Sequence, residues 1–139
     1  MLISVPVIVV IIVVALYYGL QPLQQSQNQQ KEPVESFFEI INPTVNYGWF
    51  GPNETVLFIE QLGFTLKSVG GDAHDVIIQS TAMSEPVELV YPLLKNQTRY
   101  IELYYGSRYL SQKTEEGFPV EIKIWSKEAA GTITIFLEY

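Results

Sequence analysis

The sequence of 139 residues contains no cysteine and only one histidine, His74. Without cysteine, the chain has no disulfide, no thiolate nucleophile, no iron–sulfur cluster and no cysteine-built zinc site. Basic residues are also scarce, since 8 lysines and arginines stand against 15 aspartates and glutamates, which gives a net charge of −7. This balance argues against nucleic-acid binding, because that function requires a basic surface.

Fingerprints of common enzymes are missing as well: there is no G-x-S-x-G, no P-loop and no dinucleotide-binding motif. His74 lies between Asp72 and Asp75, which could form a metal site or an acid–base pair with it. A solvent-exposed polar turn is the simpler interpretation. The adjacent Glu115 and Glu116 lack the alternating spacing of a calcium loop. We therefore expect no enzymatic activity, no cofactor, no metal and no small-molecule substrate.

Charged residues are absent before Lys31, and residues 2–20 form a nearly unbroken apolar run. As a helix, this run would be roughly 28 Å long, close to the thickness of the bilayer's hydrocarbon core. Tyr17 and Tyr18 would lie at the membrane–water boundary. A cleaved signal peptide is the alternative, but the run is longer than a signal's apolar region and bulky residues follow Ala15. The sequence predicts one N-terminal transmembrane helix that anchors the chain in the lipid bilayer.

Residues 21–35 form a glutamine-rich segment, with six glutamines between positions 21 and 30. The segment has almost no apolar side chain whose burial could offset the entropy lost on ordering. We interpret it as a stalk that holds residues 36–139 away from the membrane. The alternative is a polar stem that continues the apolar helix.

The domain at residues 36–139 alternates apolar and polar residues with a period of two, and no part shows a convincing helical period. Asn42-Pro43 is expected to end the first strand, and Gly63 suggests a bend in the second. The pattern predicts an all-β fold, an immunoglobulin-like antiparallel β-sandwich of about seven strands. These strands are expected at Ser36–Ile41, Glu54–Leu66, Asp75–Ser80, Pro86–Tyr91, Thr98–Tyr105, Phe118–Ser126 and Gly131–Glu138.

Side-chain parity suggests which residues form the core of this sandwich. Val120, Ile122 and Ile124 occupy alternate positions and are expected to face inward. Phe58 and Trp125 are candidate core aromatics, although Trp125 falls on the outward-facing parity of its strand. Because no disulfide joins the sheets, packing alone must hold them together.

An aromatic segment stands out at Asn46–Asn53, where Tyr47, Trp49 and Phe50 lie among glycines. We expect a loop between two strands. Three large aromatic side chains are costly to leave in water, so the loop either caps the open end of the sandwich or serves as an interaction tip.

Tyr100 and Tyr104 form a second aromatic group, on one strand face together with Glu102. This face is a candidate interaction surface, exposed or covered by a partner. The alternative is ordinary strand propensity, since tyrosine fits pleated surfaces well.

Two triplets match the N-glycosylation acceptor pattern, one beginning at Asn53 and the other at Asn96. Both contain threonine and both fall in expected turns, where an acceptor must be accessible. They favour an extracytoplasmic glycoprotein domain at the cell surface over a cytoplasmic one.

The stretch Thr55–Ile78 resembles adhesion-type immunoglobulin-like modules of prokaryotic surface proteins. An apolar anchor followed by such a sandwich is also similar to archaeal surface subunits of the type IV pilus and archaellum family, including the anchored stator subunit proposed to contact the surface layer. The motif that carries the resemblance consists of Val56, Phe58, Gly63, Ala73, Asp75, Val76 and Ile78.

These features predict a single-pass protein of the cell membrane, with a structural and interaction role. Its C-terminal sandwich would contact a surface layer or partner subunits. One alternative is a pilin-like filament subunit whose apolar helix packs in a filament core. The other is a non-catalytic accessory subunit of a larger membrane complex.

Overall fold

A computed structural model describes residues 31–80 and 84–138 of the chain. The predicted anchor at residues 2–20 and most of the predicted linker lie outside these residues. Over the described ranges, no helix has both the length and the apolar character needed to span a bilayer. The elements are α2 (Val34–Phe37), β1 (Phe38–Phe50), the 3-10 turn η1 (Pro52–Glu54), β2 (Val56–Ser68), β3 (Ile77–Gln79), β4 (Val87–Glu88), β5 (Thr98–Gln112), β6 (Phe118–Trp125) and β7 (Ala130–Leu137).

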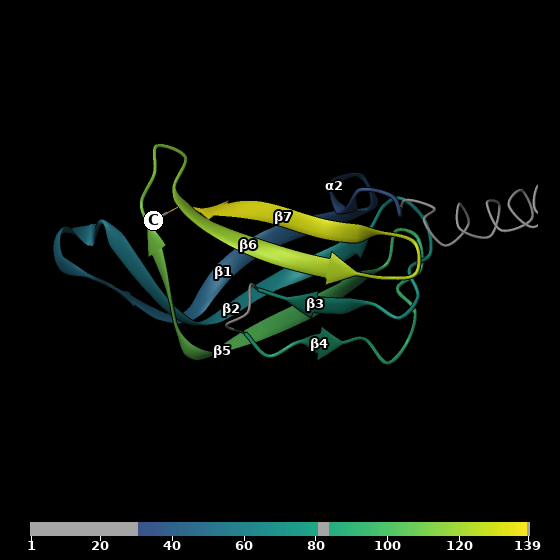
Figure 1. Ribbon diagram of the computed structural model, residues 1–139, viewed down its shortest axis with the longest axis horizontal. Helices are drawn as coiled ribbons and strands as arrows, with labels where there is room; N and C mark the ends of the chain where they lie inside the picture. The colour runs from purple at the N-terminus through teal and green to yellow at the C-terminus, as the bar shows by residue number, and fades with distance from the viewer. Residues whose placement is uncertain (1–30, 81–83, 139) are drawn as a thin grey trace, which may run out of the picture. The chain divides into compact units, whose positions relative to one another are not determined.

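The strands form two antiparallel sheets, as the sequence predicts (Figure 1). One sheet has three strands in the order β1-β2-β5, and the other has four in the order β4-β3-β6-β7. Side chains from both sheets contribute to one apolar core. The fold is therefore all-β, with the arrangement of a β-sandwich.

Strand β6 shows how the alternating pattern builds this core. Val120, Ile122 and Ile124 are fully buried, which confirms their expected inward orientation. Trp125 is 39% exposed, as its outward parity indicates. Each residue points to the opposite side of the sheet from its neighbours, so the sequence period translates directly into burial.

Phe58 is not a core residue, and in this respect the sequence interpretation is wrong. It lies on the outer face of β2 and is only partly buried. The aromatic side chains that are fully buried are instead Phe38, Phe64 and Phe118.

Strand β1 does not end at Asn42-Pro43, as the sequence suggested, but continues to Phe50. Its pairing with β2 shifts between Ile41 and Thr44, and Asn42 adopts a left-handed conformation with φ of 50°. The Asn-Pro pair thus forms a bulge on the edge strand of its sheet. Proline is tolerated there because it needs no amide hydrogen bond to a neighbouring strand.

The irregularity in β2 lies near Gly63 but not at it. Gly63 pairs regularly with Thr44 and Glu102, whereas the register with β5 shifts between Ile59 and Gln61. Glu60 and Gln61 both face away from the core as a result. Opposite them, β5 advances from Tyr104 to Tyr109 before pairing resumes.

The fourth strand is shorter than expected from Pro86–Tyr91. Only Val87–Glu88 pairs with β3, after which the Leu89 amide still donates to the Val76 carbonyl at 2.9 Å. Tyr91 is 72% exposed, so the clean alternation of this segment does not extend to its last residue.

The described chain begins at one end of the sandwich. Lys31 donates to the Ser126 carbonyl at 2.6 Å, and the Glu32 amide donates to the Glu128 carbonyl at 3.0 Å. The first described residues are thus fixed beside the β6–β7 turn. The tip of the β1–β2 hairpin lies at the opposite end, on the left in Figure 1.

Candidate functional site

Both candidate glycosylation sites are exposed. Asn53 lies in η1 at the tip of the β1–β2 hairpin, and Asn96 lies in the turn before β5. Both adopt left-handed conformations, with φ of 62° and 66°. Asparagine tolerates this conformation better than most residues and is common in turns. The geometry leaves both acceptors accessible to solvent.

The aromatic segment is not a loop, which corrects the sequence interpretation: Tyr47, Trp49 and Phe50 all lie on β1. Neighbouring strand residues point to opposite faces, so the segment divides in two. The ring of Phe50 lies 5.8 Å from that of the fully buried Phe118 and covers the end of the core. Trp49 faces outward and is 38% exposed. Phe50 is also 38% exposed, so its ring contact with Phe118 does not decide between the two alternatives, a cap on the core and contact with a partner.

Trp49 belongs to an apolar row that crosses the outer face of the three-stranded sheet. It pairs with Phe58 on β2, and Phe58 pairs with Leu110 on β5. The rings of Trp49 and Phe58 stack at 5.7 Å with an interplanar angle of 19°. Leu110, like Trp49, is exposed. We call these three residues the apolar row; they lie toward the hairpin tip.

The second aromatic group is exposed on the same outer face, with Tyr100 at 55% and Tyr104 at 54%. The Tyr104 hydroxyl donates to the Glu102 carboxylate at 2.8 Å. Asn46 donates from its side-chain amide to the Tyr100 hydroxyl at 2.9 Å. The absence of a side chain at Gly63 makes room for this contact, because a Cβ there would collide with both the Tyr100 hydroxyl and the Asn46 amide.

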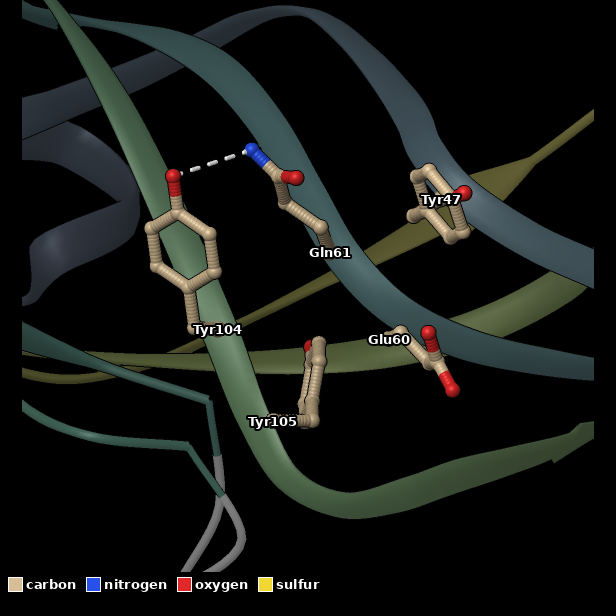
Figure 2. A pocket seen from close by; sticks show the side chains of 5 residues that line it. All are labelled: Tyr47, Glu60, Gln61, Tyr104 and Tyr105. Atoms are coloured by element: carbon tan, nitrogen blue, oxygen red, sulfur yellow. Dashed lines mark hydrogen bonds between the residues drawn. The ribbon is translucent and has the colours of Figure 1, made fainter.

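Tyr47, Gln61 and Tyr104 form a polar row across β1, β2 and β5, parallel to the apolar row. The Gln61 side-chain amide donates to the Tyr104 hydroxyl at 3.3 Å. Together with Glu60 and Tyr105, the polar row lines a hollow of about 350 Å³ (Figure 2). The hollow forms because the bulge in β2 and the excursion of β5 separate the two strands here.

The two neighbouring tyrosines at this hollow have different environments. The hydrogen bond to Glu102 is the main cause that raises the pKa of the exposed Tyr104 above its usual value of 10. Tyr105 points into the sandwich, where its hydroxyl donates to Ser80 Oγ at 2.6 Å. Burial raises the pKa of Tyr105 to about 12, although the Ser80 contact partly opposes the shift. Both phenols therefore stay protonated at neutral pH.

His74 is paired with a residue that the sequence did not suggest. Its Nδ1 lies 2.6 Å from a Glu128 carboxylate oxygen, and its backbone amide donates to the other oxygen at 2.9 Å. Asp72 instead accepts from the Lys95 amide, and Asp75 lies 3.4 Å from the Lys127 ammonium. The His74–Glu128 pair thus joins the turn before β3 to the β6–β7 turn.

No metal-binding arrangement emerges in the parts of the chain that the structure describes, where no three histidine, aspartate or glutamate side chains are grouped suitably. Glu115 and Glu116 lie exposed in the turn between β5 and β6.

Comparison with protein-family models, with curated proteins and with solved structures gives no match for this chain. Function must therefore be inferred from the geometry of the chain itself.

Sequence reasoning missed Glu60, Gln61 and Leu110 on this face, and it placed Phe58 in the core instead. Single polar or apolar residues in a strand carry no signal of their own. Only the register between distant strands brings them together.

Proposed function

We propose that the protein is a single-pass membrane protein whose extracytoplasmic β-sandwich binds a protein partner, either a surface layer or a neighbouring subunit. The observation that carries this proposal is the apolar row, in which Trp49 and Leu110 are exposed and flank the partly buried Phe58. Aromatic side chains are enriched at protein interfaces, and a stacked pair offers a rigid contact with little side-chain entropy to lose.

The position of the apolar row supports the proposal. The described chain begins beside the β6–β7 turn, and β1 then runs away from that point for 13 residues. At about 3.3 Å per residue, the row lies roughly 35 Å from the start of the strand. The row therefore lies near the hairpin tip, at the opposite end of the sandwich from the first described residues (Figure 1), and Trp49 and Leu110 are exposed there.

The strand order supports an immunoglobulin-like arrangement. In constant-type immunoglobulin domains, the first, second, fifth and fourth strands share one sheet and the third, sixth and seventh share the other. Here only the fourth strand differs, because it pairs with β3 instead. Such sandwiches commonly display binding surfaces without catalytic groups, and fold alone does not assign a function.

Site-specific photo-crosslinking in intact cells tests the proposal. A photoreactive aromatic residue placed at Trp49 should crosslink to a protein partner. The same residue at Trp125 is the matched control, because the two tryptophans are 38% and 39% exposed but lie on different sheets. Equal crosslinking from both positions, or none from Trp49, contradicts the proposed surface.

The identity of the crosslinked product separates the alternatives. Crosslinks between copies of this chain in sheared filaments would indicate a pilin-like subunit. A polytopic partner at fixed stoichiometry would indicate an accessory subunit of a membrane complex.

The membrane topology needs its own test. Protease shaving of intact cells should release peptides that contain Asn53 and Asn96, with mass additions if the acceptors are glycosylated. Protection of both peptides, while cytoplasmic markers remain intact, contradicts an extracytoplasmic domain.

A further inference from the structure

The hollow beside the polar row has the form of a ligand site. Figure 2 shows Gln61 between the rings of Tyr104 and Tyr47, with Tyr105 and Glu60 below them. Its volume of about 350 Å³ lies at the lower end of the ~300–1,000 Å³ range typical of small-ligand sites. Tyr47 and Tyr104 are two strands apart, so their backbones are separated by roughly 10 Å.

The chemistry of the lining restricts the ligand. Three of the five lining residues that the structure describes are tyrosines, and the other two are a glutamate and a glutamine. None of them is basic, so nothing in this set attracts an anion. Amide and carboxylate groups instead form paired hydrogen bonds with neighbouring hydroxyls, while a flat ring contacts the apolar C–H face of a sugar.

We propose that the outer face of the β1-β2-β5 sheet binds a neutral oligosaccharide. The chain of sugar rings would lie across the strands, from Tyr47 over Gln61 to Tyr104. Tyr47 and Tyr104 provide the stacking surfaces, and Gln61 and Glu60 contact the hydroxyl groups between them. This site goes beyond the proposed protein-binding function and does not depend on it, because the apolar row contributes no lining residue.

The polar face is held in place before any ligand arrives. The Tyr104 hydroxyl is fixed between its donor Gln61 and its acceptor Glu102, at 3.3 Å and 2.8 Å. The next exposed ring, that of Tyr100, is fixed by Asn46. A ring that is already ordered loses less side-chain entropy on binding, which favours recognition of weakly interacting sugars.

Aromatic side chains with one carboxylate are also the residue types that form a cage around a quaternary ammonium group, which is the competing interpretation of this hollow. The position of the rings favours the sugar. Tyr47 and Tyr104 lie on either side of Gln61 and span three strands, whereas a cage needs rings that surround a single point.

Isothermal titration of the full chain tests the site. The chain is kept in a polyoxyethylene detergent, because sugar-headed detergents would compete. The neutral probes are cellohexaose, mannohexaose and N-acetylchitohexaose. Polygalacturonate and tetramethylammonium represent the anionic and cationic alternatives. At least one neutral probe should bind saturably and more tightly than either charged probe.

Variants then locate the binding surface. Tyr47→Ala and Tyr104→Ala should each weaken binding about tenfold, equivalent to loss of one stacking contact. Tyr104→Phe keeps the ring but loses the two hydrogen bonds that order it, so it should weaken binding less than Tyr104→Ala does. Tyr91→Ala is the control, because Tyr91 is exposed but lies outside this face and should not affect binding.

Three results would overturn the proposal: no saturable binding of any neutral probe, tighter binding of a charged probe, or equal losses in Tyr91→Ala and Tyr104→Ala. Thermal unfolding of each variant excludes loss of fold as the cause. Photo-crosslinking from Trp49 should persist in Tyr104→Ala, so failure of the sugar site and failure of the protein-binding surface are distinguishable.

Discussion

The buried phenol of Tyr105 joins the two sheets by hydrogen bonds in a protein that has no disulfide. Tyr105 lies on β5, and its hydroxyl donates to Ser80 Oγ at 2.6 Å. Ser80 follows β3 and in turn donates to the Glu121 carbonyl on β6 at 3.0 Å. We predict that Tyr105→Phe destabilises the fold without disturbing its packing, since only the hydroxyl is removed.

The size of the effect follows from what each partner loses. A net hydrogen bond contributes about 1 kcal/mol, and Ser80 keeps its contact with Glu121, so Tyr105→Phe should cost about 1 kcal/mol. For a domain of this size, that corresponds to a fall in Tm of about 5 °C. Ser80→Ala should cost more, about 1–3 kcal/mol, because it leaves a buried phenol without an acceptor. The double variant should be no less stable than Ser80→Ala alone.

The pH dependence gives an independent check. Burial raises the pKa of Tyr105 to about 12, so the folded protein keeps this proton while the unfolded chain loses it near pH 10. Stability should therefore fall as pH rises from 10 to 12, by at most about 3 kcal/mol from this group. The Tyr105→Phe variant should not show this part of the fall in stability at high pH.

Urea unfolding of the full chain in detergent, followed by near-ultraviolet circular dichroism at pH 8 and pH 11, measures both effects. Tyr91→Phe is the control, because it removes the hydroxyl of a tyrosine that is 72% exposed and should leave stability unchanged. The reasoning is refuted if the two phenylalanine variants behave alike, or if Tyr105→Phe loses as much stability at high pH as the native chain.

Three further predictions concern the turns and the outer face. Burial raises the pKa of Glu128, but its hydrogen bonds with His74 outweigh this and leave the pKa lowered. The His74–Glu128 pair therefore stabilises the fold above pH 4.5, and this stabilisation is lost as the pH falls. In thermal unfolding, Glu128→Gln should show a smaller decrease in Tm on acidification than the native chain. The difference should be small, because the pair is partly exposed. Gly117→Ala should destabilise by about 1–3 kcal/mol in urea unfolding, since φ is 122° and a Cβ would lie 2.6 Å from the Leu137 carbonyl oxygen. Gly63→Ala should displace the Tyr100 ring, detectable as changed Tyr100 proton shifts by NMR, while a native-like spectrum would contradict the contact.

The sequence predicted the secondary structure better than the surface. Alternation within one strand is a local property, so Val120, Ile122 and Ile124 could be assigned to the core without knowledge of any neighbour. The same reasoning failed at Asn42-Pro43, where local propensity suggests a strand end. There, the edge position of β1 makes a bulge acceptable and lets the strand continue.

The candidate site could be predicted from the sequence much less well than the strands. The sequence singled out Tyr47 and Tyr104 as aromatic residues, but nothing in it indicated that they share a row with Gln61. Their alignment depends on register shifts on both sides of β2, between β1 and β2 and between β2 and β5, and Gln61 and Tyr104 are 43 residues apart in the chain. Likewise, Glu128 and His74 are 54 residues apart and meet only because two turns lie at the same end of the sandwich.

By itself, the sequence determined an all-β domain, a polar, acidic composition after the apolar N-terminal run, and the faces of its regular strands. The tertiary structure decided which exposed residues become neighbours. The physical reason is that burial of apolar side chains acts on every strand separately, whereas register is fixed only when distant strands pair and their irregularities are accommodated.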